Sequence, residues 1–293
     1  MKNLIVNADD LGWTEGVNRG ILEAFRHGIV TSTSLLANGV AFAQAVEAAR
    51  SAPGLGVGVH LNLSDGPPVA EPETVTSLLD DKGEFSSGPQ SLLLRRARRG
   101  VLLEETGREW DAQIQKIRDA GIEPTHLDGH KHVHMLPGFF ETALRLAKRH
   151  GIGAIRLSLE ASSLRAALSG PKQKSAVVLK QGVQARGLKL LARDAREQAE
   201  RAGISTADYF CGIAQTGALT REGLLAFLKS LHDGTTELMC HPGYADTALR
   251  QTATRLQNSR EAELQILTDT EIRNLVASQG IRLIDYGFVT QEA

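Results

Sequence analysis

The sequence predicts an α/β fold in which a single domain forms an irregular, TIM-barrel-like (β/α) barrel. Short apolar, β-branched segments alternate with longer helical patterns, which is typical of parallel strands joined by helical crossovers. Eight strand candidates can be counted along the 293 residues, and eight strands form a (β/α) barrel. No linker and no repeat of fixed period divides the chain, so we expect one domain over residues 1–293.

The clearest helix signal lies between the first two strand candidates. Val17, Ile21 and Phe25 fall on one helical face, with Thr14 as the expected N-cap and Gly28 as the expected helix end. Apolar, β-branched runs bounded by polar or turn residues define the strands. The eight strand candidates are 4–8, 32–38, 57–63, 125–130, 154–159, 209–213, 236–241 and 282–286.

Two connections are longer than a strand-to-helix loop normally is. They cover roughly residues 64–102 and 160–206. We interpret both as long loop insertions near the functional face of the barrel.

Composition excludes some classes of partner. With 42% hydrophobic and 23% charged residues, the chain resembles an ordinary soluble globular protein. A formal net charge of -1 gives the whole molecule no electrostatic reason to bind nucleic acid, and we expect no nucleic-acid partner. One basic run, Arg95 to Arg99, is interpreted first as a solvated helix face and otherwise as a contact for a phosphate or lipid headgroup.

Cysteine content and the first residues indicate a reducing compartment. Cys211 and Cys240 are too few for a disulfide framework and lie in apolar runs, so we expect buried thiols. The N-terminal segment MKNLIVNADD lacks a long apolar core, and no run of about 18 apolar residues occurs that could span a bilayer. These features predict a cytoplasmic protein without a transmembrane segment.

Polar residues follow four of the predicted strands. Asp9 and Asp10 end the first strand, and His60, His130 and His241 lie near the ends of three others. In a barrel of parallel strands, chemically active residues gather at the carboxyl ends of the strands. The sequence therefore predicts that these five side chains meet at one site.

The acidic pair favours a bound cation. Two neighbouring carboxylates in a poorly hydrated place repel each other unless a cation is present. Adjacent residues of an extended chain point in opposite directions, so Asp9 and Asp10 are expected to divide their roles. The competing interpretation is that one of them caps the following helix.

The segment 125–135, THLDGHKHVHM, holds four of the nine histidines. If it is extended, its alternate residues share one face but span roughly 26 Å at about 3.3 Å per residue, so one ion cannot bind all of them. The choice among His126, His130, His132 and His134 stays open at this point.

A ligand set of one carboxylate and two imidazoles predicts a divalent metal site with open positions for water and substrate. It suits metal-assisted hydrolysis and equally suits a non-haem iron oxygenase, and spacing does not separate the two. His60 could instead be a buried core histidine, and His241 a turn residue before Pro242. The ion is open between Mg and Zn, with Co, Mn and Ni as further candidates.

Five motifs, spread in order over nearly the whole chain, carry a family resemblance. They read IVNADDLG at 5–12, TSTS at 31–34, GVHL at 58–61, THLDGHKH at 125–132 and CHP at 240–242. This pattern resembles the YdjC-like carbohydrate deacetylases, which include chitooligosaccharide deacetylases. The resemblance implies an irregular (β/α) barrel that removes the N-acetyl group from an amino sugar and releases acetate.

The resemblance also implies roles for individual residues. Asp10, His60 and His130 become the metal ligands, Asp9 the general base, and His241 the general acid for the leaving amine.

Three further residues, Asp128, His132 and Arg156, become candidates for orienting the site or contacting the substrate. Two departures matter. Leu11 stands where the family usually has an aromatic residue, and the motif around Arg156 lacks the proline that it often contains.

The stretch DYFCGIAQTGALT at 208–220 resembles a hopanoid-biosynthesis-associated branch of the family, whose substrates are glycosylated lipids. Such a substrate would imply peripheral membrane contact, and a homo-oligomer is left open. Besides the deacetylase, two other functions stay in view: a metal oxygenase with the same ligands, and a non-catalytic sugar-binding protein.

Overall fold

The computed structural model describes residues 1–293 except 86–87, 93, 95–102, 170–193, 253 and 292–293. Parts of both predicted insertions fall in these gaps. The basic run Arg95 to Arg99 lies outside the described residues, so the membrane contact attached to it stays a prediction.

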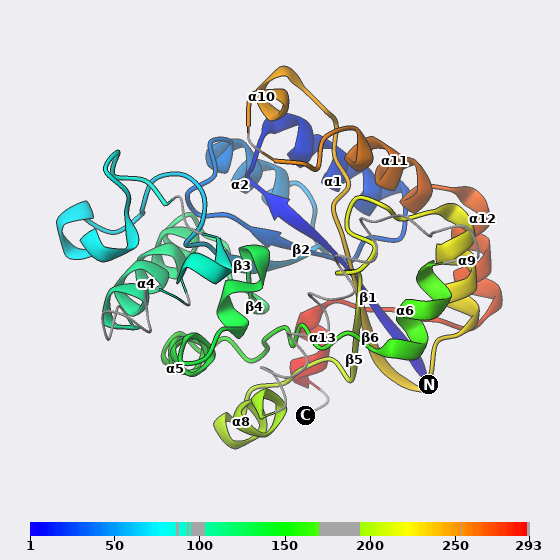
Figure 1. The fold of residues 1–293 in the computed structure, drawn as a ribbon. Coiled ribbons are helices and arrows are strands. Elements are labelled where there is room, and N and C mark those ends of the chain that lie inside the picture. Colours follow the sequence, from blue (N-terminus) through cyan, green and yellow to red (C-terminus); the bar gives the residue numbers. More distant parts are fainter. Residues whose placement is uncertain (86–87, 93, 95–102, 170–193, 253, 292–293) are drawn as a thin grey trace.

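The centre of the molecule is a parallel β-sheet, as the sequence predicts (Figure 1). Its order is β4-β3-β2-β1-β6-β5, and β7 pairs with β1 at the end away from β2. The strands are β1 (Lys2–Leu11), β2 (Ser32–Leu35), β3 (Gly56–Leu61), β4 (Leu127–Gly129), β5 (Tyr209–Cys211), β6 (Gly234–Cys240) and β7 (Arg282–Leu283).

One of the eight expected strands does not form. Residues 154–159 make only isolated bridges, among them Ile155 with Leu127 of β4, and the next residue, Glu160, pairs with Phe210 of β5. Leu159 donates its N–H to the Leu157 carbonyl at 2.7 Å, and this tight local bond interrupts an extended ladder. The segment still links the two outer strands β4 and β5. The barrel is therefore irregular, as expected, but its ring closes through bridges rather than through a regular strand.

Helices surround the strands (Figure 1). The Thr14 side chain accepts from Val17 N at the start of α1, and Gly28 follows its last residue, which confirms both predicted boundaries. The α-helices in the described part are α1 (Glu15–His27), α2 (Phe42–Arg50), α4 (Leu103–Asp119), α5 (Phe139–Arg149), α6 (Ser162–Ser169), α8 (Ala195–Ala202), α9 (Arg221–Lys229), α10 (Thr247–Arg250), α11 (Asn258–Leu267), α12 (Thr270–Ser278) and α13 (Tyr286–Gln291). Short 3-10 helices are η1 (Pro72–Thr74), η2 (Thr76–Leu78) and η3 (His130–Met135).

The core lies between the strands and the surrounding helices. Strand β1 is buried from Asn3 to Leu11, and it packs most extensively against β6, whose last five residues are buried. Cys211 and Cys240 are free and buried, as predicted. Among the described residues, no helix combines the length and the apolar character that crossing a bilayer requires.

Candidate metal centre and active site

The acidic pair lies at an irregularity in β1. The pairing register of β1 with β2 shifts between Ala8 and Leu11, and Asp10 adopts a φ of 73°, in the left-handed region. Asp9 and Asp10 therefore do not point to opposite sides. His60 Nε2 lies 4.0 Å from Asp9 Oδ2 and 3.5 Å from Asp10 Oδ1. Because the strand is bulged here, both carboxylates lie near the same histidine, and the expected division of roles between them stays a prediction.

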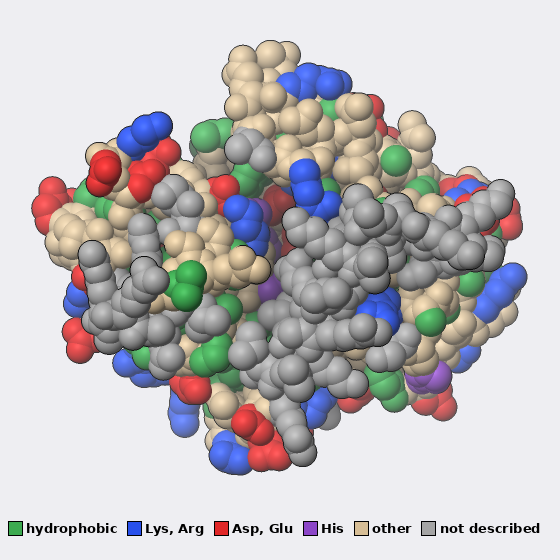
Figure 2. Space-filling view, viewed as in Figure 1, with side chains coloured by type: hydrophobic (Ala, Val, Ile, Leu, Met, Phe, Trp, Pro, Cys, Tyr) green, Lys and Arg blue, Asp and Glu red, His purple; other side chains and the backbone are tan. Residues whose placement is uncertain are grey.

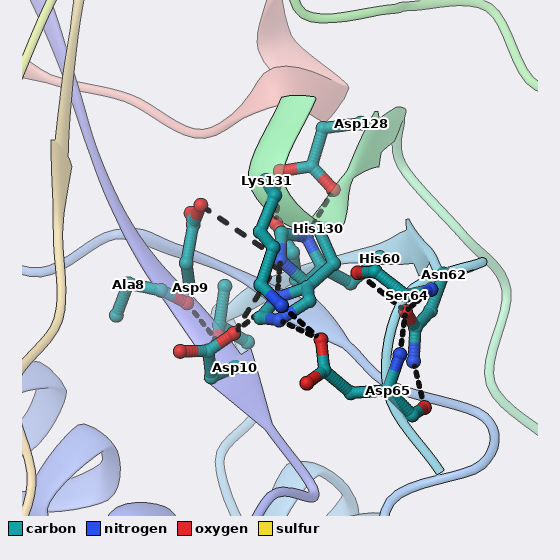
Figure 3. Close-up of polar contacts among 12 residues, drawn as sticks. Ala8, Asp9, Asp10, His60, Asn62, Ser64, Asp65, Asp128, His130 and Lys131 are labelled. Atoms are coloured by element: carbon teal, nitrogen blue, oxygen red, sulfur yellow. Dashed lines mark hydrogen bonds and ion pairs between the residues drawn. The ribbon is translucent and has the colours of Figure 1, made fainter. Parts of the chain in front are cut away.

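Three side chains from three strand ends converge, as Figure 3 shows. One ligand atom from each of Asp10, His60 and His130 can be chosen so that all lie within 4.8 Å of one another. His130 Nδ1 lies 3.0 Å from Asp10 Oδ1 and 3.3 Å from His60 Nε2. All three residues are buried. This is the carboxylate and imidazole set expected from the sequence.

A sharp turn after β4 determines which histidine reaches this group. Lys131 and His132 have φ values of 52° and 58°, so the chain leaves the strand direction immediately after His130. Left-handed conformations at non-glycine residues are costly and are often found at functional sites. Because of this turn, the histidines of the segment do not share one extended face.

The converging group fits a divalent cation. Asp10 Oδ1 is buried and has no hydrogen-bond partner among the described residues, yet it faces the nitrogens of His60 and His130. A buried carboxylate oxygen without a donor is costly, and a cation would satisfy it. One carboxylate and two imidazoles are ligands that transition metals accept readily.

A second possible group consists of Asp9, His60 and Asp128. It is less available, because Arg156 already binds both oxygens of Asp9, at 2.8 and 2.7 Å. Asp128 accepts from Ser34 at 2.7 Å and lies 2.7 Å from His60 Nδ1. The group with the unpartnered oxygen of Asp10 is therefore the better candidate for an ion.

Asp128 orients His60. A carboxylate only accepts, so His60 Nδ1 carries the proton in the 2.7 Å contact with Asp128, and Nε2 faces the converging group. Burial lowers the pKa of His60, but the charge of Asp128, the nearby Asp10 carboxylate and the hydrogen bond with Asp128 outweigh it and raise that pKa to about 10. Without an ion, His60 is therefore protonated at neutral pH.

Arg156 is fully buried and binds three carboxylates. Its Nη1 and Nη2 groups grip Asp9, Nη1 lies 2.7 Å from Asp128 Oδ2, and Nε donates to Glu237 Oε1 at 2.8 Å. Burial raises the pKa of the Asp9 carboxyl, but the charge and hydrogen bonds of Arg156 outweigh it and hold that pKa below its usual value. Asp9 is therefore ionised at neutral pH.

The converging group of Asp10, His60 and His130 borders a cavity of about 440 Å³. Figure 2 shows a hollow near the middle of one face, with histidine and acidic side chains in its floor and basic side chains at its rim. All five residues predicted to meet at the strand ends line the cavity. Of the three predicted orienting or substrate-contacting residues, only His132 lines it, whereas Asp128 and Arg156 lie buried behind it.

The four histidines of the segment separate into distinct positions. His130 belongs to the converging group, and His132 lines the cavity with its Nδ1 held 2.8 Å from Ser158 Oγ. His126 stacks on Tyr286 with ring centroids 4.0 Å apart. His134 Nε2 lies 3.1 Å from the Arg156 carbonyl oxygen, to which it can donate.

His241 directly follows β6 and lines the cavity. It lies close enough to both acidic residues of β1 for their charges to act on it. Burial lowers its pKa to about 4, although the charges of Asp10 and Asp9 oppose the shift. Its Nδ1 is buried without a hydrogen-bond partner in the described part of the chain. At neutral pH, His241 is therefore a neutral imidazole.

Comparison with known proteins identifies the family of the chain. A family model described as YdjC-like protein matches residues 3–278. The chain belongs to the YdjC-like family. It is 35% identical over 283 residues to a carbohydrate deacetylase of Geobacillus stearothermophilus, with 96% of each chain covered. It is 34% identical over 291 residues to a chitooligosaccharide deacetylase of Escherichia fergusonii, with 97% of each chain covered.

A solved structure supports the same assignment. A protein of Enterococcus faecalis V583, named for cellobiose-phosphate cleavage, superposes on this YdjC-like chain with a TM-score of 0.75. The two chains are 32% identical, and 97% of each is covered. The resemblance read from the five sequence motifs is thereby confirmed at the level of the family.

Several residues at the site of this YdjC-like protein were not predicted. Asp65 Oδ2 lies 3.3 Å from His130 Nε2 and pairs with Lys131 Nζ at 2.5 Å. The Trp13 ring lies 5.1 Å from the His130 ring, centroid to centroid. Arg260 and Glu263 approach from α11. Lys131 lies inside the motif at 125–132 and Asp65 lies four residues after the motif at 58–61, which was a weak signal, but nothing in the spacing of α11 indicates its contacts.

Proposed function

We propose that this YdjC-like protein is a metal-dependent hydrolase that removes the N-acetyl group from an amino sugar, in an oligosaccharide or a glycolipid, and releases acetate. One observation carries the proposal: the unpartnered oxygen of Asp10 meets His60 and His130 at the floor of a cavity, with the ionised Asp9 beside them. Matches to carbohydrate deacetylases along nearly the whole chain support it.

Asp10, His60 and His130 would hold one divalent ion. Bound there, the ion would polarise the acetamide carbonyl and make water a stronger nucleophile. Two imidazole ligands favour Zn, Co, Mn or Ni over Mg, which prefers oxygen ligands and retained water. We therefore rank Zn and the other transition metals above Mg, with Mg kept as a metal to be tested.

Asp9 is the proposed general base. It lines the cavity, is ionised, and is fixed by the two-pronged contact with Arg156. A rigid carboxylate next to the reacting group can take the proton from the attacking water without first reorganising. Arg156 and Asp128 then serve as positioning residues for Asp9 and His60, and His132, which lines the cavity, is the proposed substrate contact.

His241 is the proposed general acid for the leaving nitrogen. Because its pKa is about 4, it holds no second proton in the resting site at neutral pH. The proton that it delivers must therefore be one released during the attack on the amide. Its unpartnered Nδ1 can accept such a proton.

The test is acetate release from N-acetylglucosamine, diacetylchitobiose and an N-acetylglucosaminyl lipid, with each of the five metals added to metal-free protein. Acetate is expected from at least one substrate. If none yields acetate with any of the metals, the proposed reaction is wrong. Oxygen uptake with Fe(II) would instead support an oxygenase, and sugar binding without turnover a binding protein.

Two variants separate the proposed roles. Asp9→Asn should lose turnover on both the amide and p-nitrophenyl acetate, while it still binds the metal. His241→Asn should lose the amide reaction but keep ester cleavage, because p-nitrophenolate leaves without a proton. If His241→Asn lowers both reactions equally, His241 is not the acid.

A further inference from the structure

Helix α11 (Asn258–Leu267) brings two buried charged residues to the site. Arg260 is 1% exposed and Glu263 is 3% exposed. They are three residues apart, so they share one face of the helix. Long charged side chains are rarely this deeply buried without a partner, and each has one at the site.

Arg260 binds the proposed metal ligand Asp10. Its Nη2 donates to Asp10 Oδ2 at 2.5 Å, while Nε donates to the Leu256 carbonyl at 3.1 Å. Oδ2 of Asp10 therefore accepts from the guanidinium, while Oδ1 is directed at His60 and His130. The charge of Arg260 also opposes the effect of burial and holds the pKa of Asp10 well below its usual value.

Glu263 binds the chain at the proposed acid instead. It accepts from His241 N at 2.6 Å and from Gly217 N at 3.2 Å. The same helix also accepts from Gly243 N through the Arg260 carbonyl at 3.2 Å. One helix face thus contacts the metal ligand through Arg260 and the His241 segment through Glu263, and substitutions at the two residues can be compared directly.

The arrangement at Asp10 has two physical consequences. The guanidinium occupies one lone pair of Asp10 Oδ2 and draws on its charge, so Oδ1 is the better ligand for an ion. A cation held next to the ligand also repels a divalent ion, more strongly in a buried place than in water. Arg260 therefore weakens ion binding, but it leaves the charge of the ion less neutralised and so better able to polarise a carbonyl.

We propose that Arg260 is a positioning residue that limits Asp10 to one coordinating oxygen. The ion is then bound less tightly, and kcat is higher. The proposal rests on the proposed ion site at Asp10. A merely structural role makes the opposite prediction for binding, because loss of a buried support would loosen Asp10 and weaken the ion.

The experiment compares metal-free wild type with Arg260→Gln, Arg260→Lys and Glu263→Gln. Co²⁺ affinity is measured by calorimetry at pH 8, and coordination is followed by the visible absorption of the Co²⁺ protein. Arg260→Gln is expected to bind Co²⁺ at least tenfold more tightly, to show a weaker visible band as Asp10 adds a second oxygen, and to lose at least tenfold in kcat. Arg260→Lys keeps the charge and should bind within about threefold of wild type.

Glu263→Gln is the matched control on the same helix face, and its Co²⁺ affinity should not change. Arg260→Met is a second neutral variant, so that misfolding of one substitution does not end the test. Equal or weaker Co²⁺ binding by the folded neutral variants overturns the proposal. The binding measurements need no substrate, so a wild type that binds Co²⁺ but releases no acetate would count against the proposed reaction and not against the role of Arg260.

Discussion

Replacement of Arg156 by methionine tests the charge arrangement behind the site. The substitution removes the only guanidinium among the described residues that contacts Asp9, Asp128 and Glu237, all buried. Breaking a buried ion pair from one side costs about 3–5 kcal/mol. Three carboxylates lose their partner here, but protonation of one of them limits the cost. Burial already raises the pKa of Glu237, so Glu237 would take up a proton first.

We therefore expect Arg156→Met to lower the free energy of unfolding by about 4 kcal/mol. For a chain of this size, that corresponds to a fall in Tm of about 10 °C. The assay is thermal unfolding followed by circular dichroism at pH 7.5, with EDTA present so that no bound ion contributes. Arg149→Met is the control: Arg149 is mostly exposed and pairs with Asp111 at 3.2 Å, so its loss should cost less than about 1 kcal/mol.

The loss should also depend on pH. Arg156 holds the pKa of Asp9 and of Asp128 below the usual value, so the stability that they contribute is present above pH 4 and is lost at lower pH. In Arg156→Met the same carboxyl groups are buried without a cation, so their pKa values rise and protonation relieves the variant. The gap in Tm should therefore narrow between pH 7.5 and pH 5. A fall of less than about 3 °C at pH 7.5, or a gap that does not change with pH, would refute the reasoning.

Three further predictions concern the ion and the packing. Ion binding at pH 7.5 should release about one proton, because His60 has a pKa of about 10 without the ion and must give up a proton to coordinate it. Calorimetry in buffers of different ionisation enthalpy measures the number of protons released. Ion binding without proton release would contradict this prediction. Chelation should abolish acetate release and lower Tm, and both should return when Zn²⁺ is added; activity that survives dialysis against chelator would exclude a required ion. Gly58→Ala should destabilise the fold by about 1–3 kcal/mol, because a Cβ at Gly58 would lie 2.3 Å from the His126 ring. The control is Gly88→Ala, which has open space around it and should change Tm little. Gly54 is not suitable as a control because its φ of 93° would strain an alanine.

Much of the site could be predicted because strand ends carry local signals. The polar residues that follow apolar strands mark the carboxyl edge of a parallel sheet, and this rule pointed to Asp9, Asp10, His60 and His241, which line the cavity. The family resemblance was needed to select His130 from the four histidines of its segment. The cap at the start of α1 was equally local. In each case, the residues that make the feature are neighbours in sequence.

The rest depends on contacts between distant segments. The bulge at Asp10 exists because β1 shifts register against β2, which no residue in IVNADDLG specifies. In the turn after His130, Lys131 and His132 adopt the left-handed backbone conformation, which normally favours glycine, so the sequence does not predict the turn. Arg260 lies 250 residues from Asp10 along the chain, and only the fold brings them together.

The missing strand at 154–159 has a consequence for how the molecule opens. This stretch joins β4 to β5 with a few bridges, so its backbone is held less firmly than the strands on either side. Arg156 lies within it and anchors it to the interior by ionic contacts with Asp9, Asp128 and Glu237. The segment that closes the barrel between β4 and β5 is thus held by ion pairs more than by backbone hydrogen bonds of a regular strand. Thermal opening of this segment would separate Asp9 from its guanidinium first, so the proposed base would lose its support before the protein lost its fold.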